Sequence, residues 1–154
     1  QLDLSREEAQ QFIDTYFERF SGVRAFLDEQ VATAKEQGYV ETLMGRRRYI
    51  PELKAQNYNM RQFGERVAQN TPIQGTAADM IKKAMIDVAE ALVAEDSGAR
   101  MLLQVHDELL FEVPRGEEDA LAALVVRHME GAMKLDVPLV AEGGFGESWY
   151  ETKG

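Results

Sequence analysis

The chain has 154 residues and a mass of 17.4 kDa, which is the size of one domain or of a large part of one. Apolar residues make up 45% and charged residues 29% of the sequence, so general disorder and collagen-like structure are excluded. No cysteine is present, which excludes disulfides, thiolate catalysis and cysteine-ligated metals and is compatible with a reducing cytoplasm. No apolar run approaches the ~18 residues that a membrane-spanning helix needs.

The net charge of −10 is unevenly distributed along the chain. Residues 1–45 have a net charge of −5 and residues 84–154 a net charge of −10. Residues 46–83, in contrast, carry eight basic and three acidic side chains, a net charge of +5. A basic block of this kind can follow a phosphate backbone locally although the whole chain is acidic. From charge alone, a solvated face is the simpler interpretation.

The first third of the chain predicts two helices followed by a hairpin. Ser5 and Glu8 form a capping box that begins the first helix. A Ser-Gly pair separates it from the second helix, for which Gly38 is a suitable residue just after the end. Residues 39–43 and 47–50 are then typical of the two strands of a short hairpin.

The middle of the chain predicts two helices in succession. Apolar residues at i, i+3 and i+7 begin the first near residue 59. A second capping box at Thr71–Gln74, with Pro72 at the first helical position, predicts the start of the next helix. The apolar stripe of that helix continues to an end near residues 96–98.

The last third predicts a hairpin, a helix and a final strand. Residues 99–105 and 109–113 are apolar and compatible with β-structure, and only residues 106–108 separate them. Three acidic residues at 117–119 suit the start of a helix, and residues 137–142 are typical of a strand. We therefore expect an α+β fold, in which an antiparallel sheet made of this hairpin and the final strand is covered by the long helix and its neighbours.

The tip of this hairpin places two carboxylates side by side, those of Asp107 and Glu108. Like charges held together disfavour each other's ionisation unless a cation balances them, and Mg²⁺ or Mn²⁺ prefers such oxygen ligands. The alternative is an exposed turn, in which Asp is common anyway. The dipeptide His106-Asp107 also matches metal-dependent phosphohydrolases, but the only other histidine, His128, lies in a predicted helix, and we reject that interpretation.

A second group of polar residues is spaced four apart, namely Arg66, Asn70 and Gln74. On one helix, or on two abutting helices, these side chains would line one face. They could then reach the hydrogen-bond acceptors that every Watson–Crick pair presents in the minor groove. Such contacts recognise the geometry of base pairing and not the base sequence. The alternative is local: Gln74 completes the capping box, Asn70 caps or ends a helix, and Pro72 interrupts it.

Three consecutive arginines, Arg46, Arg47 and Arg48, lie in the first hairpin. In a strand, the first and third share a face while Arg47 points away, so at most two act on one ligand. We interpret this run as a solvated hairpin.

Two stretches carry a family resemblance, ERVAQNTPIQGTAAD at 65–79 and QVHDE at 104–108. With GYVETL at 38–43, GRRRY at 45–49 and VPL at 137–139, the chain resembles the C-terminal part of bacterial family A DNA polymerases along essentially its whole length.

This resemblance implies an incomplete polymerase domain. Residues 1–58 would be helices and a hairpin from the base of the fingers, and residues 59–154 part of the palm.

The resemblance also implies roles for both groups of polar residues. Asp107 would be a catalytic ligand of two Mg²⁺ ions, Glu108 the neighbouring carboxylate, and His106 would lie near the primer terminus. The minor-groove side of template and primer would be held by Arg66, Asn70 and Gln74. The implied partners are primer-template DNA and deoxynucleoside triphosphates, in the bacterial cytoplasm at the nucleoid and with no membrane.

One departure from the family is large. Neither the family's first motif, which supplies another metal-binding aspartate, nor its second motif, a fingers helix that binds the nucleotide, is found in the 154 residues. The two-metal site would need that additional aspartate and the upstream polymerase region, so we expect no polymerisation by this chain alone. The rival interpretation is a non-catalytic module that binds duplex DNA or a helical partner without a metal.

Overall fold

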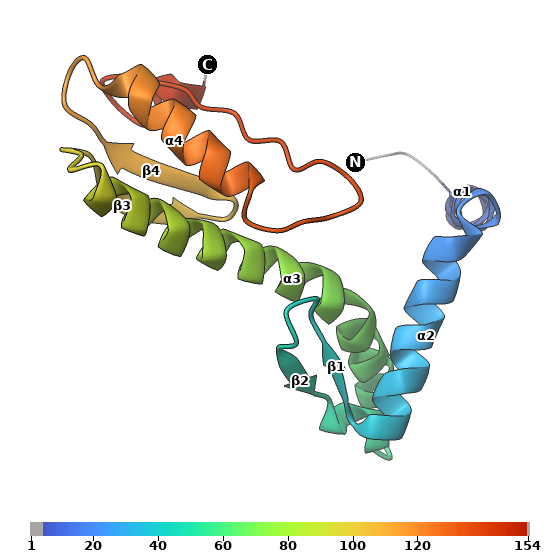
Figure 1. Cartoon of the computed structure of the whole chain (residues 1–154). Coiled ribbons are helices and arrows are strands. Elements are labelled where there is room, and N and C mark those ends of the chain that lie inside the picture. Colours follow the sequence, from blue (N-terminus) through green and yellow to red (C-terminus); the bar gives the residue numbers. More distant parts are fainter. Residues whose placement is uncertain (1–4, 154) are drawn as a thin grey trace. The chain divides into compact units, whose positions relative to one another are not determined.

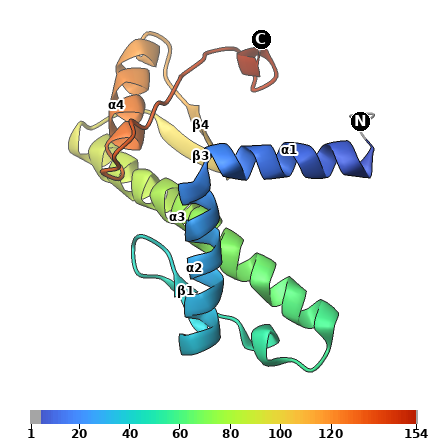
Figure 2. The same cartoon turned by 90° about the vertical axis from the view of Figure 1, so that its right-hand side faces the viewer.

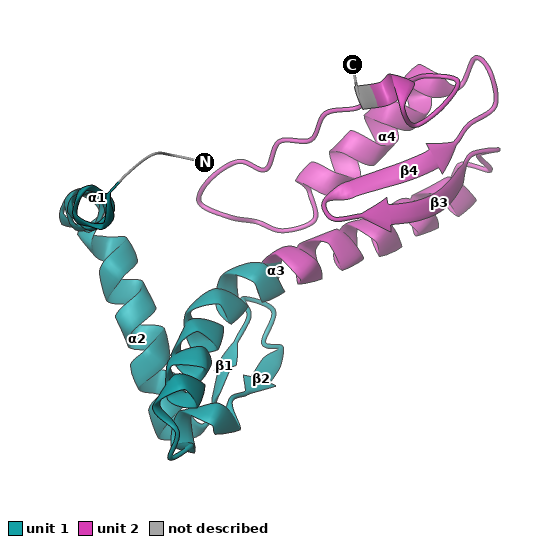
Figure 3. Cartoon of the chain, turned by 180° about the vertical axis from the view of Figure 1, so that it is seen from behind, with its two compact units in different colours: residues 1–76 teal, residues 77–154 magenta. Residues whose placement is uncertain are grey.

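The structure is a computed structural model in which residues 5–153 are described (Figure 1). Its elements, in chain order, are α1 (Arg6–Arg19), α2 (Ser21–Gln37), β1 (Tyr39–Glu41), β2 (Arg47–Tyr49), η1 (Pro51–Lys54), α3 (Tyr58–Ala94), β3 (Arg100–Val105), β4 (Glu108–Glu112), α4 (Glu118–Glu130) and η2 (Glu151–Lys153). Contacts divide the chain into two compact units, unit 1 (residues 1–76) and unit 2 (residues 77–154), and α3 is continuous through their boundary (Figure 3). This mixture of helices and small antiparallel sheets confirms the α+β class.

The described helices include none that is both long and apolar enough to cross a membrane.

The start of α1 and the end of α2 lie where the sequence predicts, but the Ser21-Gly22 pair, expected between the helices, forms the first two residues of α2. The Ser5 hydroxyl accepts a hydrogen bond from the Glu8 amide at 3.2 Å, and the Glu8 carboxylate accepts one from the Ser5 amide at 2.8 Å, so the capping box is complete. α2 ends at Gly38, whose φ of 85° is the left-handed conformation that glycine adopts at low cost. Figure 2 shows α1 running across the end of α2 and not alongside it, and α1 contains no buried residue.

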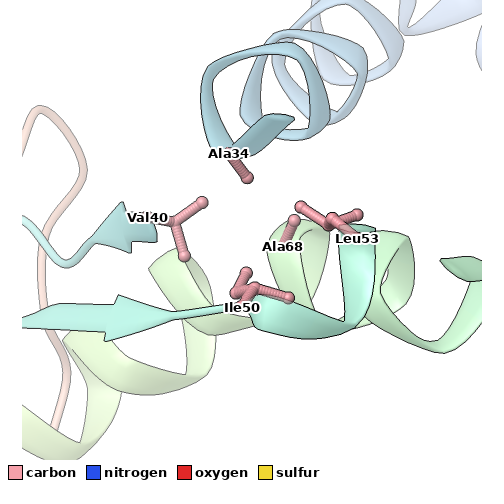
Figure 4. Close-up of a cluster of buried hydrophobic side chains, with 5 residues drawn as sticks. All are labelled: Ala34, Val40, Ile50, Leu53 and Ala68. Atoms are coloured by element: carbon pink, nitrogen blue, oxygen red, sulfur yellow. The ribbon is translucent and has the colours of Figure 1, made fainter. Parts of the chain in front are cut away.

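The core of unit 1 joins all of its elements except α1. Its buried side chains come from α2, β1, the end of β2, η1 and α3, and they are Ala34, Val40, Ile50, Leu53 and Ala68 (Figure 4). Strands β1 and β2 pair antiparallel, with Val40 opposite Arg48 and Glu41 opposite Arg47. Because Val40 and Ile50 are each only 1% exposed, this core fixes the hairpin against α3.

The structure corrects the prediction of two helices in the middle of the chain. α3 is one helix of 37 residues, and Pro72 lies inside it, not at a start. The expected capping box at Thr71–Gln74 is therefore wrong. A proline forfeits one helical hydrogen bond, but Pro72 is buried, and its carbonyl accepts a hydrogen bond from the Thr76 hydroxyl at 2.5 Å. Tertiary packing thus overrides the local signal.

Unit 2 consists of the second half of α3, the β3–β4 hairpin, α4 and the C-terminal segment. Its core combines side chains of α3 and α4 with one at the start of the hairpin, namely Val88, Leu92, Ala99, Leu121 and Leu124. Met101 and Phe111, which are directly opposite each other in the hairpin, pack against this core. Leu102 and Leu103 remain 53% and 42% exposed at an irregularity in β3.

The predicted final strand at 137–142 is wrong, so the sheet of unit 2 has two strands and not three. Val137 and Val140 are 66% and 76% exposed, and the Ala141 amide donates to the Glu130 carboxylate at 3.1 Å. A strand exists only where a neighbouring strand accepts and donates its backbone hydrogen bonds. Neither β3 nor β4 pairs with this segment, so the segment has no neighbouring strand with which to form backbone hydrogen bonds, although its composition is typical of a strand.

Candidate nucleic-acid interface and metal-binding tip

Arg66, Asn70 and Gln74 lie on one face of α3. Because Pro72 does not interrupt the helix, the spacing of four residues brings all three exposed side chains into one row. The local alternatives fail: neither Asn70 nor Gln74 is at a helix end, and neither side chain has a capping role.

A groove runs along this face of α3, with a volume of about 320 Å³. We call it the α3 groove, and it is lined by Arg48, Phe63, Arg66, Val67, Asn70, Thr71 and Gln74. A second hollow of about 540 Å³ shares three of these residues and is lined by Thr42, Arg46, Arg47, Arg48, Tyr49, Thr71, Gln74 and Gly75. Neither lining contains a carboxylate, although the whole chain has a net charge of −10. Both hollows therefore suit an anionic ligand.

The polar side chains of the α3 groove are available for a ligand. Within residues 5–153, no hydrogen bond or ion pair occupies the side chains of Arg48, Arg66, Asn70 or Gln74. In contrast, Arg47 bonds to the Glu41 carboxylate at 2.6 Å, and its guanidinium lies 4.7 Å from the centre of the Tyr39 ring. The hydrogen bond to Glu41 raises the pKa of Arg47 above its ordinary value. One arginine thus stabilises the hairpin, while Arg48 faces the groove.

The tip of the β3–β4 hairpin is a two-residue turn. Val105 pairs with Glu108, so Glu108 is the first residue of β4 and not part of the turn as expected. His106 has a φ of 54°, a left-handed conformation that is uncommon for residues other than glycine. Its carbonyl accepts a hydrogen bond from the Gln104 side-chain amide at 2.7 Å, which closes the turn.

Asp107 is therefore presented at the outermost point of the hairpin. It is exposed, and its carboxylate has no hydrogen-bond or ion-pair partner among the described residues. Glu108 is also exposed and does have an interaction. Carboxylate oxygens are the ligands that Mg²⁺ prefers, and proteins commonly hold this ion through one or two carboxylates together with water and phosphate oxygens. The donor type at the tip fits Mg²⁺.

The number of donors at the tip is small. In the part of the chain that the structure describes, no group of three or more His, Asp or Glu side chains could hold a metal, and His128 in α4 therefore belongs to no such group. The tip and the α3 groove belong to different units.

Sequence reasoning did not assign several residues of the groove. From the sequence alone, Phe63 and Val67 fit an apolar helical stripe, and Arg48 fits a solvated run of arginines. The alternation of a strand did separate Arg48 from Arg47. No local signal indicates that the hairpin packs beside α3, because residues 33 positions apart make that contact.

The family model of "DNA polymerase family A" matches residues 1–151. DNA polymerase I of Bacillus subtilis is 56% identical over 152 residues, which cover 99% of this chain and 17% of that protein. DNA polymerase I of Mycobacterium bovis is 53% identical over 149 residues, which cover 97% of this chain and 16% of that protein. The chain thus spans about a sixth of the length of these relatives.

A solved structure is similar throughout. The POL domain of a polymerase from M. smegmatis, in complex with DNA primer-template and dNTP, is 50% identical with a TM-score of 0.95. The similarity covers 99% of this chain and 27% of that one. On this evidence the chain belongs to DNA polymerase family A.

Proposed function

We propose that this chain provides part of the catalytic domain of a DNA-directed DNA polymerase, which transfers nucleotides from deoxynucleoside triphosphates to a primer under the direction of a template. Beyond family membership, the observation that carries this proposal is the α3 groove. It presents three hydrogen-bond donors at a helical spacing, beside one further arginine, Arg48, and its lining has no carboxylate. The similar M. smegmatis structure is a complex with DNA primer-template and dNTP, which supports the same partners here.

In this proposal the row on α3 holds the primer-template duplex from its minor groove. Arg66, Asn70 and Gln74 can donate hydrogen bonds to the purine N3 and pyrimidine O2 atoms, which occupy similar positions in every correct base pair. The groove would therefore favour correct pairing over any particular sequence. Its neutral and basic lining also suits the phosphates on either side.

Asp107 would hold the metal at the β3–β4 tip, with Glu108 as the supporting carboxylate. When bound, Mg²⁺ would lower the pKa of the primer 3′-hydroxyl and neutralise charge on the leaving pyrophosphate. The two-residue turn presents Asp107 without a competing partner among the described residues, and the hydrogen bond from Gln104 to His106 fixes the backbone of the tip. His106 would lie beside the primer terminus.

The tip alone should not assemble a two-metal site. Two cations about 3.5–4 Å apart need ligands from more than one place in the chain, and no group of three candidate ligands occurs among the described residues. We therefore propose that the 154 residues alone do not extend a primer and that a further part of a family A polymerase supplies the other aspartate. Template-dependent incorporation by the purified chain with Mg²⁺ would contradict this.

A hybrid polymerase tests the function itself. In it, this chain replaces the matching 152-residue region of Bacillus subtilis DNA polymerase I, which is 56% identical. We expect the hybrid polymerase to extend a primer, and Asp107→Ala to abolish extension while DNA affinity is retained. If Asp107→Ala leaves primer extension unchanged, the result favours the rival function, in which the chain binds duplex DNA without taking part in catalysis.

A further inference from the structure

Arg48 approaches the α3 groove from a different element than the other polar residues. It lies on β2, opposite Val40, and it lines both the α3 groove and the second hollow. Arg66, Asn70 and Gln74 all come from α3. The groove therefore has two walls, and Arg48 is the cation of the wall formed by the hairpin.

A threonine hydroxyl fastens this hairpin to α3. The Leu43 amide, in the turn between β1 and β2, donates to the Thr76 hydroxyl at 3.0 Å. The same hydroxyl donates to the carbonyl of Pro72 at 2.5 Å, so Thr76 links the turn to α3 next to Gln74. Thr76 is only 6% exposed, so water does not compete for either hydrogen bond.

The turn itself is held by a second buried threonine. The Thr42 hydroxyl accepts from the Arg46 amide at 3.1 Å, and the Thr42 amide donates to the Arg46 carbonyl at 3.0 Å. The hairpin also lies very close to the helix at this point, because a Cβ atom on Gly75 would come within 2.6 Å of the Thr42 methyl group. The position of β2 relative to α3 is thus strongly determined within unit 1.

We propose that Arg48 is a fourth nucleic-acid-binding residue of the α3 groove, that it binds a backbone phosphate, and that the Thr76 hydroxyl positions it. This inference rests on the proposed function. A guanidinium on the wall opposite a row of base-reading side chains suits the phosphate backbone, which borders both sides of a minor groove.

A purely structural role for Arg48 does not account for its surroundings. No ion pair or hydrogen bond of its side chain occurs in the part of the chain that is described, and neither hollow that it lines contains a carboxylate. Arg47, the next residue, has such a role, because Glu41 and the Tyr39 ring hold it. The two arginines therefore form a matched pair on one strand. The side chain of Arg47 is engaged within the hairpin, and that of Arg48 is available to a ligand.

The first test measures the salt dependence of DNA binding by the hybrid polymerase and a fluorescent primer-template duplex. Each phosphate contact contributes about 0.9 to the slope of log K against log salt concentration. We expect Arg48→Ala to lower the slope by about 0.9 and Arg48→Lys to keep it, since the lysine retains the charge. Arg47→Ala, the matched control, should change the slope by less than half as much.

The second test concerns the position of Arg48. Thr76→Val keeps the shape of the side chain but removes the hydroxyl, whereas Thr76→Ser keeps the hydroxyl. We expect Thr76→Val to weaken DNA binding several-fold in the presence of Arg48 and to add almost nothing to Arg48→Ala, while Thr76→Ser binds normally. A purely structural effect would instead weaken binding equally with and without Arg48, which would overturn the role of Thr76.

The failures of the two proposals are distinguishable. If the unaltered hybrid polymerase does not bind primer-template DNA, the proposed function fails and this inference fails with it. If the hybrid binds and Arg66→Ala weakens binding, but Arg48→Ala leaves the salt slope unchanged, only the inference is overturned. Melting temperatures of all variants separate loss of binding from loss of folding, and Thr76→Ala, which also removes the hydroxyl, replaces the valine variant if that variant does not fold.

Discussion

Unit 1 builds both walls of its groove from its own elements, with α3 on one side and the β1–β2 hairpin on the other. Unit 2, in contrast, presents Asp107 at the end of a two-residue turn, where the described part of the chain offers no group of three metal ligands. The proposed surface for holding nucleic acid is thus formed within the chain, whereas the proposed metal site needs ligands from elsewhere. DNA binding and catalysis should therefore respond separately to substitutions in the two units.

The largest effect is expected at the tip. In the hybrid polymerase, Asp107→Asn should reduce kcat by at least about 10²-fold, because in the proposed function it removes a metal-ligating charge at the reacting centre. Glu108→Gln should reduce kcat less, since its carboxylate is the supporting one. The measurement is single-turnover incorporation at saturating DNA.

Glu112→Gln is the matched control for this tip prediction. It removes a carboxylate from the far end of the same strand, opposite Arg100, and should leave kcat unchanged. Equal losses for Glu112→Gln and Asp107→Asn would show that hairpin charge in general, and not a metal-binding tip, is responsible.

The next effect concerns what the α3 groove recognises. Gln74→Ala should lower the preference for correctly paired over mispaired primer ends by about tenfold, since a well-placed pair of hydrogen bonds to a base contributes about 1–3 kcal/mol of discrimination. The measurement is the ratio of kcat/KM values for matched and mispaired primers. Gln69→Ala lies on the same helix outside the groove lining and should leave that ratio unchanged. An unaltered ratio for Gln74→Ala would contradict recognition of base pairs by this face.

The contrast between the units also shows which parts of the fold a sequence can predict. The capping box at Ser5 and the helix end at Gly38 depend on neighbours a few residues away, and both are confirmed. The β3–β4 hairpin is confirmed for the same reason, with Glu108 moved into the strand. Pro72 also gives a strong local signal, yet the prediction is wrong because burial of the helix outweighs the lost hydrogen bond.

Predictions that depend on contacts between residues far apart in the sequence are less accurate than those that depend on neighbouring residues. The segment at 137–142 has the composition of a strand, but a strand needs a ladder that no local pattern specifies. The candidate residues of α3 were identified because a spacing of four survives in any helix. The sequence does not identify Arg48 as a residue of the groove. Its position beside the α3 residues depends on a contact between Leu43 and Thr76, which are 33 positions apart.

A smaller effect tests whether the core of unit 1 holds the hairpin wall in place. Ile50→Val removes one methylene group from a side chain that is 1% exposed, next to the end of β2. It should lower the free energy of unfolding by about 0.5–1.5 kcal/mol. Urea unfolding measures this, and Ile73→Val is the matched control, since Ile73 on α3 is 58% exposed and should lose much less. Equal losses at both positions would contradict a core at Ile50.

The smallest effect is expected at α1, because this helix has no buried residue and its stability therefore depends most on local interactions. Hydrogen bonds from the Ser5 amide and hydroxyl lower the pKa of Glu8 below its ordinary value of 4.5. A carboxylate whose pKa is lower in the folded state stabilises that state fully above its unfolded pKa and loses this contribution as the pH falls through its folded pKa. The helical content of α1 should therefore decrease below about pH 4.5, as circular dichroism of the chain would show.

Glu8→Gln should remove this part of the pH dependence, because a neutral amide does not titrate. Glu7→Gln, at a neighbouring position outside the capping box, should retain it. If both variants behave alike, the general charge at the start of the helix, and not the capping box, sets the acid sensitivity of α1.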